Sequence, residues 1–114
     1  MTQALVLKDS TITRMNVIAN RTNSVELGII KSMMLQELKA KLASGIAHFI
    51  YTKKPNKLGE IEVREAWGTT KSDLAAAKTN GRGVSRELFK TTAYFDCIKG
   101  EWRSFRWENL VHVF

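Results

Sequence analysis

Between residues 24 and 44, apolar side chains recur every three or four positions, as they do along one face of an amphipathic helix. This apolar stripe consists of Leu27, Ile30, Met34, Leu38 and Leu42, and it is widened by Ile29 and Met33. Asn23, with Glu26 three residues later, predicts a capping box at the start of the helix. Gly45 is the expected stop, because glycine readily adopts the left-handed conformation that ends many helices. The pattern predicts one helix over about residues 24–44.

After Gly45 the apolar period changes from that of a helix to that of a strand. The segments with strand character are 46–53, 60–69, 93–98, 101–107 and 110–114. In residues 60–69, Ile61, Val63 and Trp67 alternate with polar side chains and predict the buried face of the strand. Pro, Asn and Gly within residues 54–60 predict a turn, so the first two strands form a hairpin. Lys99-Gly100 predicts a second, tighter hairpin.

One helix followed by about five short antiparallel strands predicts an α+β domain, mainly β, that forms a small closed or half-closed barrel. We expect residues 24–114 to form this single domain. Residues 1–23 are weakly patterned and are predicted to be an N-terminal arm or extension, which could hold a strand, a short helix or a mobile segment. Residues 70–92 are predicted to be a long basic loop, and a connection of this length is usually functional or mobile.

The amino-acid composition gives the chain a strong positive charge. The 114 residues include 18 Lys and Arg against 11 Asp and Glu, a net charge of +7. An excess of this size in a small domain is the expected footprint of a nucleic-acid binder, although an acidic protein partner would suit the same surface. No apolar run is long enough for a membrane span or a signal peptide, so we expect a cytoplasmic protein with no membrane partner.

The residue types that carry catalysis or bind metals are nearly absent from the sequence. Cys97 is the single cysteine, which excludes an internal disulfide and a Cys-x-x-Cys metal site, and we expect it to be a small buried apolar side chain. His48 and His112 both fall in predicted strands among apolar residues, where a structural role is expected. The glycines of residues 80–83 lack the Gly-Lys-Ser/Thr that completes a P-loop. We therefore expect no enzymatic activity, no cofactor and no metal.

Basic side chains interleaved with aromatic ones predict a nucleic-acid site, because cations attract phosphates and exposed rings stack on bases. The candidate residues are Lys53, Lys54, Lys57, Arg82, Arg86, Arg103, Arg106 and Trp102. Two of the three rings Trp102, Phe105 and Trp107 are expected in the core, since a barrel this small has few other large residues. Arg106 could instead form an ion pair across the strands, and its possible partners are Glu101, Glu62 and Glu65.

The C-terminal residues also carry a family resemblance. The segments concerned are Tyr94-Phe95-Asp96, residues 99–106 and Glu108-Asn109-Leu110, together with residues 49–54 after the helix. They resemble the closing hairpin of SH3-like barrel domains of unknown function from bacteria and their phages, over about residues 34–114. More distantly, the chain is similar to the WYL domain, whose barrel ends in a strand of the form R-x-F-R, here residues 103–106. The Trp-Tyr-Leu triplet itself is replaced by Ala93-Tyr94-Phe95.

The resemblance implies a five-stranded SH3-like barrel, and WYL domains are associated with nucleic-acid and ligand sensing. We therefore expect a non-enzymatic binding module for nucleic acid of low sequence specificity, with single-stranded DNA or RNA favoured. By resemblance it would be a regulatory factor in a bacterial cell or a phage-infected host. The alternative is a protein-interaction module that docks on a larger host or phage complex. A homodimer through the helix at 24–44 would follow if its apolar stripe is wider than the barrel covers.

Overall fold

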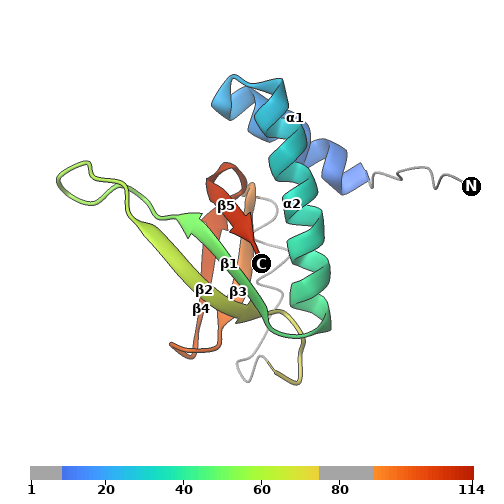
Figure 1. Ribbon diagram of the computed structural model, residues 1–114, viewed down its shortest axis with the longest axis vertical. Coiled ribbons are helices and arrows are strands. Elements are labelled where there is room, and N and C mark those ends of the chain that lie inside the picture. Colours follow the sequence, from blue (N-terminus) through green and yellow to red (C-terminus); the bar gives the residue numbers. More distant parts are fainter. Residues whose placement is uncertain (1–8, 75–88) are drawn as a thin grey trace, which may run out of the picture.

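A computed structural model of the chain describes residues 9–74 and 89–114. Two helices precede a five-stranded antiparallel sheet (Figure 1). The elements are α1 (Asp9–Thr22), α2 (Val25–Ser44), β1 (Ala47–Thr52), β2 (Val63–Thr69), β3 (Thr91–Asp96), β4 (Glu101–Arg106), the 3-10 helix η1 (Trp107–Asn109) and β5 (Leu110–Val113). The predicted α+β class is confirmed, with two helices in place of one. None of the described helices is long and apolar enough to span a membrane.

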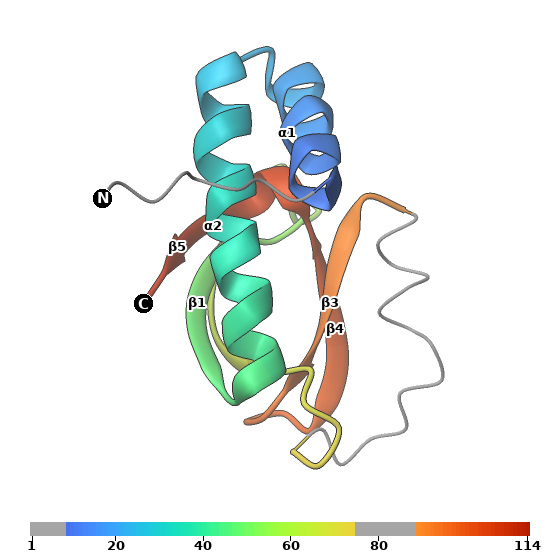
Figure 2. The same ribbon diagram turned by 90° about the vertical axis from the view of Figure 1, so that its right-hand side faces the viewer.

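The strands are hydrogen-bonded in the order β4-β3-β2-β1-β5, so the last strand of the chain lies beside the first. The β1–β2 hairpin runs in register from the Ala47–Gly68 pair to the Thr52–Val63 pair, and it confirms the first predicted hairpin. β3 and β4 form the second predicted hairpin around Gly100, whose φ is 70°. Figure 2 shows that the sheet curls, with α2 running along it and α1 near one end of the sheet.

The N-terminal segment is a helix over residues 9–22, one of the forms that its sequence left open. It packs against the first half of α2, where the contact is close because small residues face it. A Cβ added to Gly28 would lie 2.6 Å from the Met15 carbonyl oxygen, and Ser32 is 1% exposed. Ile18 of α1 is fully buried and joins the main apolar cluster.

The range predicted for α2 is confirmed, but its predicted cap and buried face are wrong in part. Ser24, and not Asn23, is the N-cap: its side-chain oxygen accepts a hydrogen bond from the Leu27 amide at 3.1 Å. Asn23 has a φ of 57°, which turns the chain between the two helices. The buried positions of α2 are Gly28, Ser32, Leu35, Leu38 and Leu42. Two predicted members of the stripe, Leu27 and Ile30, are 39% and 55% exposed, because α1 and the barrel contact a neighbouring face.

The core lies between α2 and the concave side of the sheet. Its ring-bearing members are Phe49, Tyr51, Tyr94, Phe105 and Trp107, and its aliphatic members include Leu35, Leu38, Leu42 and Leu110. Phe105 and Trp107 are 4% and 3% exposed while Trp102 is half-buried, which confirms the expectation for these three rings. Cys97 is half-buried, so it is more accessible than we expected.

The predicted buried face of β2 is wrong. Ile61 precedes the strand and is 66% exposed, and Val63 is 62% exposed. The positions that face the core are the alternate ones, Arg64, Ala66 and Gly68, of which the last two are buried. Small residues are required there because the large rings of β1 and β3 already fill the space. A Cβ on Gly68 would lie 2.4 Å from Cδ2 of Tyr94.

We predict that Gly68→Ala destabilises the protein, because the added methyl group must displace the buried Tyr94 ring. Overpacking of this kind costs about 1–3 kcal/mol of unfolding free energy. Urea denaturation measures the difference. The matched control is Gly45→Ala, where a Cβ meets nothing within 4 Å and the backbone is extended. Equal stability of the two variants would contradict the tight packing of β2 on Tyr94.

Candidate nucleic-acid interface

A basic cleft of about 480 Å³ opens between α1, the β1–β2 hairpin, the start of β3 and the end of β4. Five cationic residues line it: Arg21, Lys53, Lys54, Arg64 and Arg106. They come from segments far apart in sequence, and the curl of the sheet brings them together. No carboxylate lines this cleft within the two described ranges, 9–74 and 89–114. Its polar walls therefore carry hydrogen-bond donors and positive charge, which suits an anionic ligand.

Two of these cations are partly neutralised by neighbours outside the cleft. Arg21 donates to a carboxylate oxygen of Glu108 at 2.9 Å. Lys53 donates to Glu62 at 3.0 Å, and this hydrogen bond is the main reason that the pKa of Glu62 is lowered. Lys54 and Arg106 are both exposed, and neither has an ion pair with another described residue. The cleft therefore keeps at least two charges available for a ligand.

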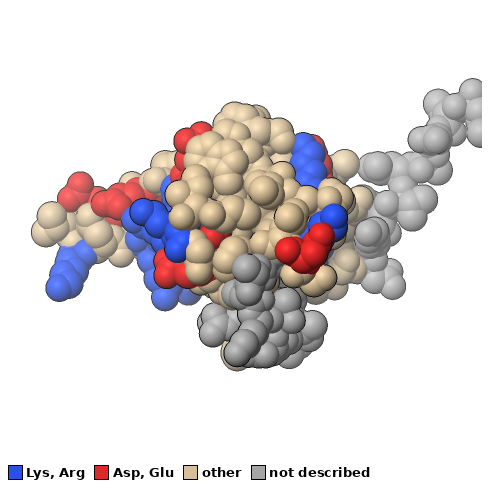
Figure 3. Space-filling model, turned by 90° about the horizontal axis from the view of Figure 1, so that it is seen from below, with Lys and Arg blue, Asp and Glu red and all other residues tan. Residues whose placement is uncertain are grey.

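The surface of the projecting β1–β2 hairpin carries both basic and acidic side chains. Seen from below, basic and acidic side chains lie next to each other along the hairpin, and most of the described surface beside it is uncharged (Figure 3). On this face basic and acidic residues are mixed, whereas the described lining of the cleft holds basic residues without acidic ones.

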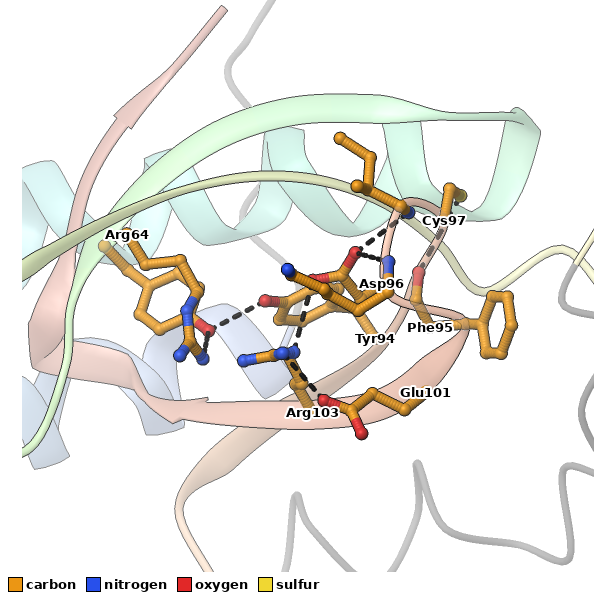
Figure 4. Close-up of polar contacts among 10 residues, drawn as sticks. Arg64, Tyr94, Phe95, Asp96, Cys97, Glu101 and Arg103 are labelled. Atoms are coloured by element: carbon orange, nitrogen blue, oxygen red, sulfur yellow. Dashed lines mark hydrogen bonds and ion pairs between the residues drawn. The ribbon is translucent and has the colours of Figure 1, made fainter.

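Arg64 is held at the cleft by two buried tyrosines (Figure 4). Its guanidinium donates to the Tyr51 hydroxyl at 3.1 Å, and that hydroxyl is 2.7 Å from the hydroxyl of Tyr94. Burial opposes the charge on Arg64, but the two tyrosine hydroxyls outweigh it and raise the pKa of the guanidinium. Burial, helped by the hydrogen bond with Tyr51, raises the pKa of Tyr94 well above its usual value. The site thus has a fixed, permanently charged arginine at its base.

A second charged cluster lies at the β3–β4 turn, where one arginine contacts two carboxylates. Arg103 contacts Asp96 at 3.2 Å and Glu101 at 2.7 Å. Asp96 also accepts hydrogen bonds from the backbone amides of Ile98 and Lys99, at 3.0 Å each, and so fixes the turn. With its two carboxylate partners, Arg103 has no free charge to offer a phosphate. It lines a separate cavity of about 130 Å³.

The structure brings together three of the eight residues predicted from the sequence: Lys53, Lys54 and Arg106. Lys57 is exposed in the hairpin loop outside the cleft lining. Trp102 packs edge-to-face on Phe95, with ring centroids 5.9 Å apart, also away from the cleft. Arg82 and Arg86 lie outside the described residues. The alternative ion pairs of Arg106 are not formed, since Glu62, Glu65 and Glu101 contact Lys53, His48 and Arg103.

Sequence reasoning missed other cleft residues, among them Arg21, Arg64 and Phe89. The alternation of apolar residues in the predicted strand placed Ile61, Val63 and Trp67 on the buried face. It therefore placed Arg64 on the opposite, solvent-facing side. Arg21 belongs to a segment without a clear pattern, and only the packing of α1 brings it to the barrel. The Phe89 ring is 69% exposed at the cleft, and an apolar residue at the end of a basic loop was the available signal.

The histidines contribute packing and a hydrogen bond. The His48 ring is stacked between Trp67 and Phe114, with centroid distances of 4.3 and 4.0 Å. Its Nε2 lies 2.8 Å from a carboxylate oxygen of Glu65. His112 contacts the edge of Phe114. Within the described part of the chain, no group of three His, Cys, Asp or Glu is arranged to hold a metal ion.

The two helices and the curled five-stranded sheet define a small SH3-like barrel domain. The chain belongs to the family described as WYL_2, Sm-like SH3 beta-barrel fold, whose model matches residues 35–111. The match begins within α2 and takes in β1 to β4 and the start of β5, so the resemblance to SH3-like and WYL-like barrels is confirmed. No curated protein and no solved structure matches the chain. α1, which supplies Arg21 to the cleft, precedes the matched range.

We predict that the buried tyrosine pair makes the protein sensitive to alkaline pH. In the unfolded chain Tyr94 ionises near pH 10, whereas in the folded protein its raised pKa keeps it protonated. The folded state therefore binds more protons above pH 10, and its stability falls as the pH rises. Between pH 9 and 11, Tyr94→Phe should lose about 1.4 kcal/mol less unfolding free energy than the natural protein. Urea titrations at both pH values measure this, and equal losses would contradict it.

Proposed function

We propose that the protein binds single-stranded nucleic acid, DNA or RNA, through the basic cleft and with low sequence specificity. The observation that carries this proposal is the lining: five cations from α1, the β1–β2 hairpin and β4, with no described carboxylate among them. Phosphate attraction supplies most of the affinity of nucleic-acid binders of low specificity. Contacts to phosphates position a strand but carry no information on its sequence.

The size and walls of the cleft favour a single strand over a duplex. A volume of about 480 Å³ is that of a small-ligand pocket and has room for about one or two nucleotides. The exposed ring of Phe89 at its side offers a stacking surface for an unpaired base. The buried tyrosines hold Arg64 in place before a ligand arrives, which reduces the entropy lost on binding.

The first test is binding of fluorescently labelled oligo-dT, oligo-rU and a DNA duplex, measured by anisotropy at about 50 and 200 mM salt. The Lys54→Gln/Arg106→Gln double variant removes the two cleft cations that lack an ion pair with a described residue. We expect weaker binding and a salt slope that is shallower by about 1.4, because each phosphate contact on a single strand contributes about 0.7.

The matched control is Lys71→Gln/Lys99→Gln, which removes the same formal charge from exposed residues outside the cleft. It should bind nearly as the natural protein does. An equal loss in both double variants would mean that the affinity is nonspecific charge attraction and would rule out the cleft. No binding of any probe at micromolar protein would overturn the proposed function and favour a protein partner.

A second prediction concerns the stacking surface. Phe89→Ala should weaken binding of the single strands at least about fivefold, since stacking on an aromatic ring contributes about 1–3 kcal/mol per base. Phe89→Trp keeps a ring and should retain the affinity. Ile98→Ala removes an equally exposed apolar side chain at the far turn and serves as the control. If Phe89→Ala binds normally while the charge variant does not, the phosphates are bound without base stacking.

A further inference from the structure

The outward face of α2 is apolar and carries a shallow groove of about 580 Å³. Its lining residues are Ile30, Met33, Met34, Gln36, Glu37 and Ala40. Ile30 is 55% exposed and Met33 is 39% exposed, and Ile29 beside them is 43% exposed. These residues recur at helical spacing over three turns, so the exposed side chains form one continuous stripe and not scattered contacts.

The described elements leave this stripe uncovered because α2 meets them on its other faces. The first half of α2 faces α1 with Gly28 and Ser32, and its second half faces the barrel with Leu35, Leu38 and Leu42. Within residues 9–74 and 89–114, no element covers Ile30 or Met33. A contiguous apolar patch of a few hundred Å² is often functional in a monomeric protein.

We propose that this face binds a second copy of the chain, with the two α2 helices packed antiparallel about a two-fold axis. The charges on the stripe are self-complementary for that arrangement. Glu26 lies in the first turn of α2 and Lys41 in the last. Both are about 11 Å from the midpoint between Met33 and Met34, at a rise of about 1.5 Å per residue. A two-fold axis at that midpoint places Glu26 opposite Lys41 of the second copy, twice per dimer.

The same two-fold axis sets the partners of the other groove side chains, and it places Ile30 opposite Glu37 of the second copy. It places the two Met33-Met34 pairs together at the centre, where the flexible thioethers adapt to each other. Ala40 then lies opposite Leu27 of the second copy, so that a small side chain packs against a large one. In the monomer the Lys41 amine contacts Glu37 at 3.1 Å and donates to the Phe114 carbonyl oxygen at 2.6 Å. Its side chain is 41% exposed, and a third N–H remains for Glu26 of the second copy.

The extent of the face sets the strength of the dimer. A helix of 20 residues is about 30 Å long, and a strip about 10–12 Å wide along it has an area of roughly 300–360 Å² per copy. A stable interface buries about 800 Å² per partner. We therefore expect a reversible dimer with a Kd in the micromolar range or above, and a monomer in dilute solution.

Sedimentation velocity of the full chain between 5 and 500 µM, at low salt, tests the proposal. The natural protein should shift from monomer to dimer across this range. Met33→Glu places a charge at the centre of the face and should remain monomeric at 500 µM. Ile98→Glu adds the same charge at an exposed apolar residue outside this face and should dimerise normally. A natural protein that stays monomeric at 500 µM, or a Met33→Glu variant that still dimerises, would overturn the proposal.

Charge reversal tests the antiparallel pairing itself. Glu26→Lys and Lys41→Glu should each weaken dimerisation, roughly fivefold for two surface pairs. The double variant Glu26→Lys/Lys41→Glu restores opposite charges across the interface and should return the Kd to within about twofold of the natural value. A double variant as weak as the singles would rule out this arrangement. Because the readout is mass alone, the result does not depend on whether the basic cleft binds nucleic acid.

Discussion

The contact between the inward face of α2 and the concave side of the sheet is the interaction on which the rest of the structure depends. A five-stranded sheet of this size cannot bury large rings by itself, and the three leucines Leu35, Leu38 and Leu42, all fully buried, complete its core. The end of α2 is also tied to β2. The Leu42 carbonyl accepts hydrogen bonds from the Thr70 amide and the Thr69 hydroxyl, at 2.9 and 3.1 Å. The helix thus fixes both the core and the curl of the strand beside it.

The same helix positions the end of the chain. Lys31 donates to the Glu108 carbonyl oxygen and Lys41 to that of Phe114, both at 2.6 Å. Burial disfavours the charged amine of Lys31 and lowers its pKa. The negative charge of Glu108 opposes this shift and partly offsets it. Because Glu108 also binds Arg21, the two helices meet at η1. The wall of the basic cleft formed by α1 and η1 is therefore a consequence of how α2 is packed.

The order and type of the elements could be predicted from the sequence because period and turn chemistry are local properties. The range of α2, the two hairpins and the short final strand all follow from them. Which face of a helix or strand is buried depends on the elements that pack against it. The residues Ile30, Ile61 and Val63 have apolar side chains and lie outside, because α1 and the large rings of β1 and β3 take the inner space. Their exposure could not be read from α2 or β2 alone.

The candidate site was predictable to the same limited degree. A lysine pair after a predicted strand is easily recognised as exposed, and Lys53 and Lys54 do line the cleft. Arg103 has the same local sequence context as Arg106, yet only its packing against Asp96 and Glu101 reveals that its charge is already balanced. Net charge therefore identified the class of ligand to consider, while the distribution of carboxylates in space identifies which cations can meet it.

The basic cleft and the outward face of α2 share no lining residue, so the two proposed interactions do not compete for the same side chains. A two-fold dimer through α2 would carry two clefts in a fixed relation. A strand long enough to reach both would bind the second cleft as an intramolecular step, and its overall affinity would exceed that of either cleft. A small cleft with room for about one or two nucleotides would gain most from such a doubling, because under the proposed function each cleft alone would make few phosphate contacts.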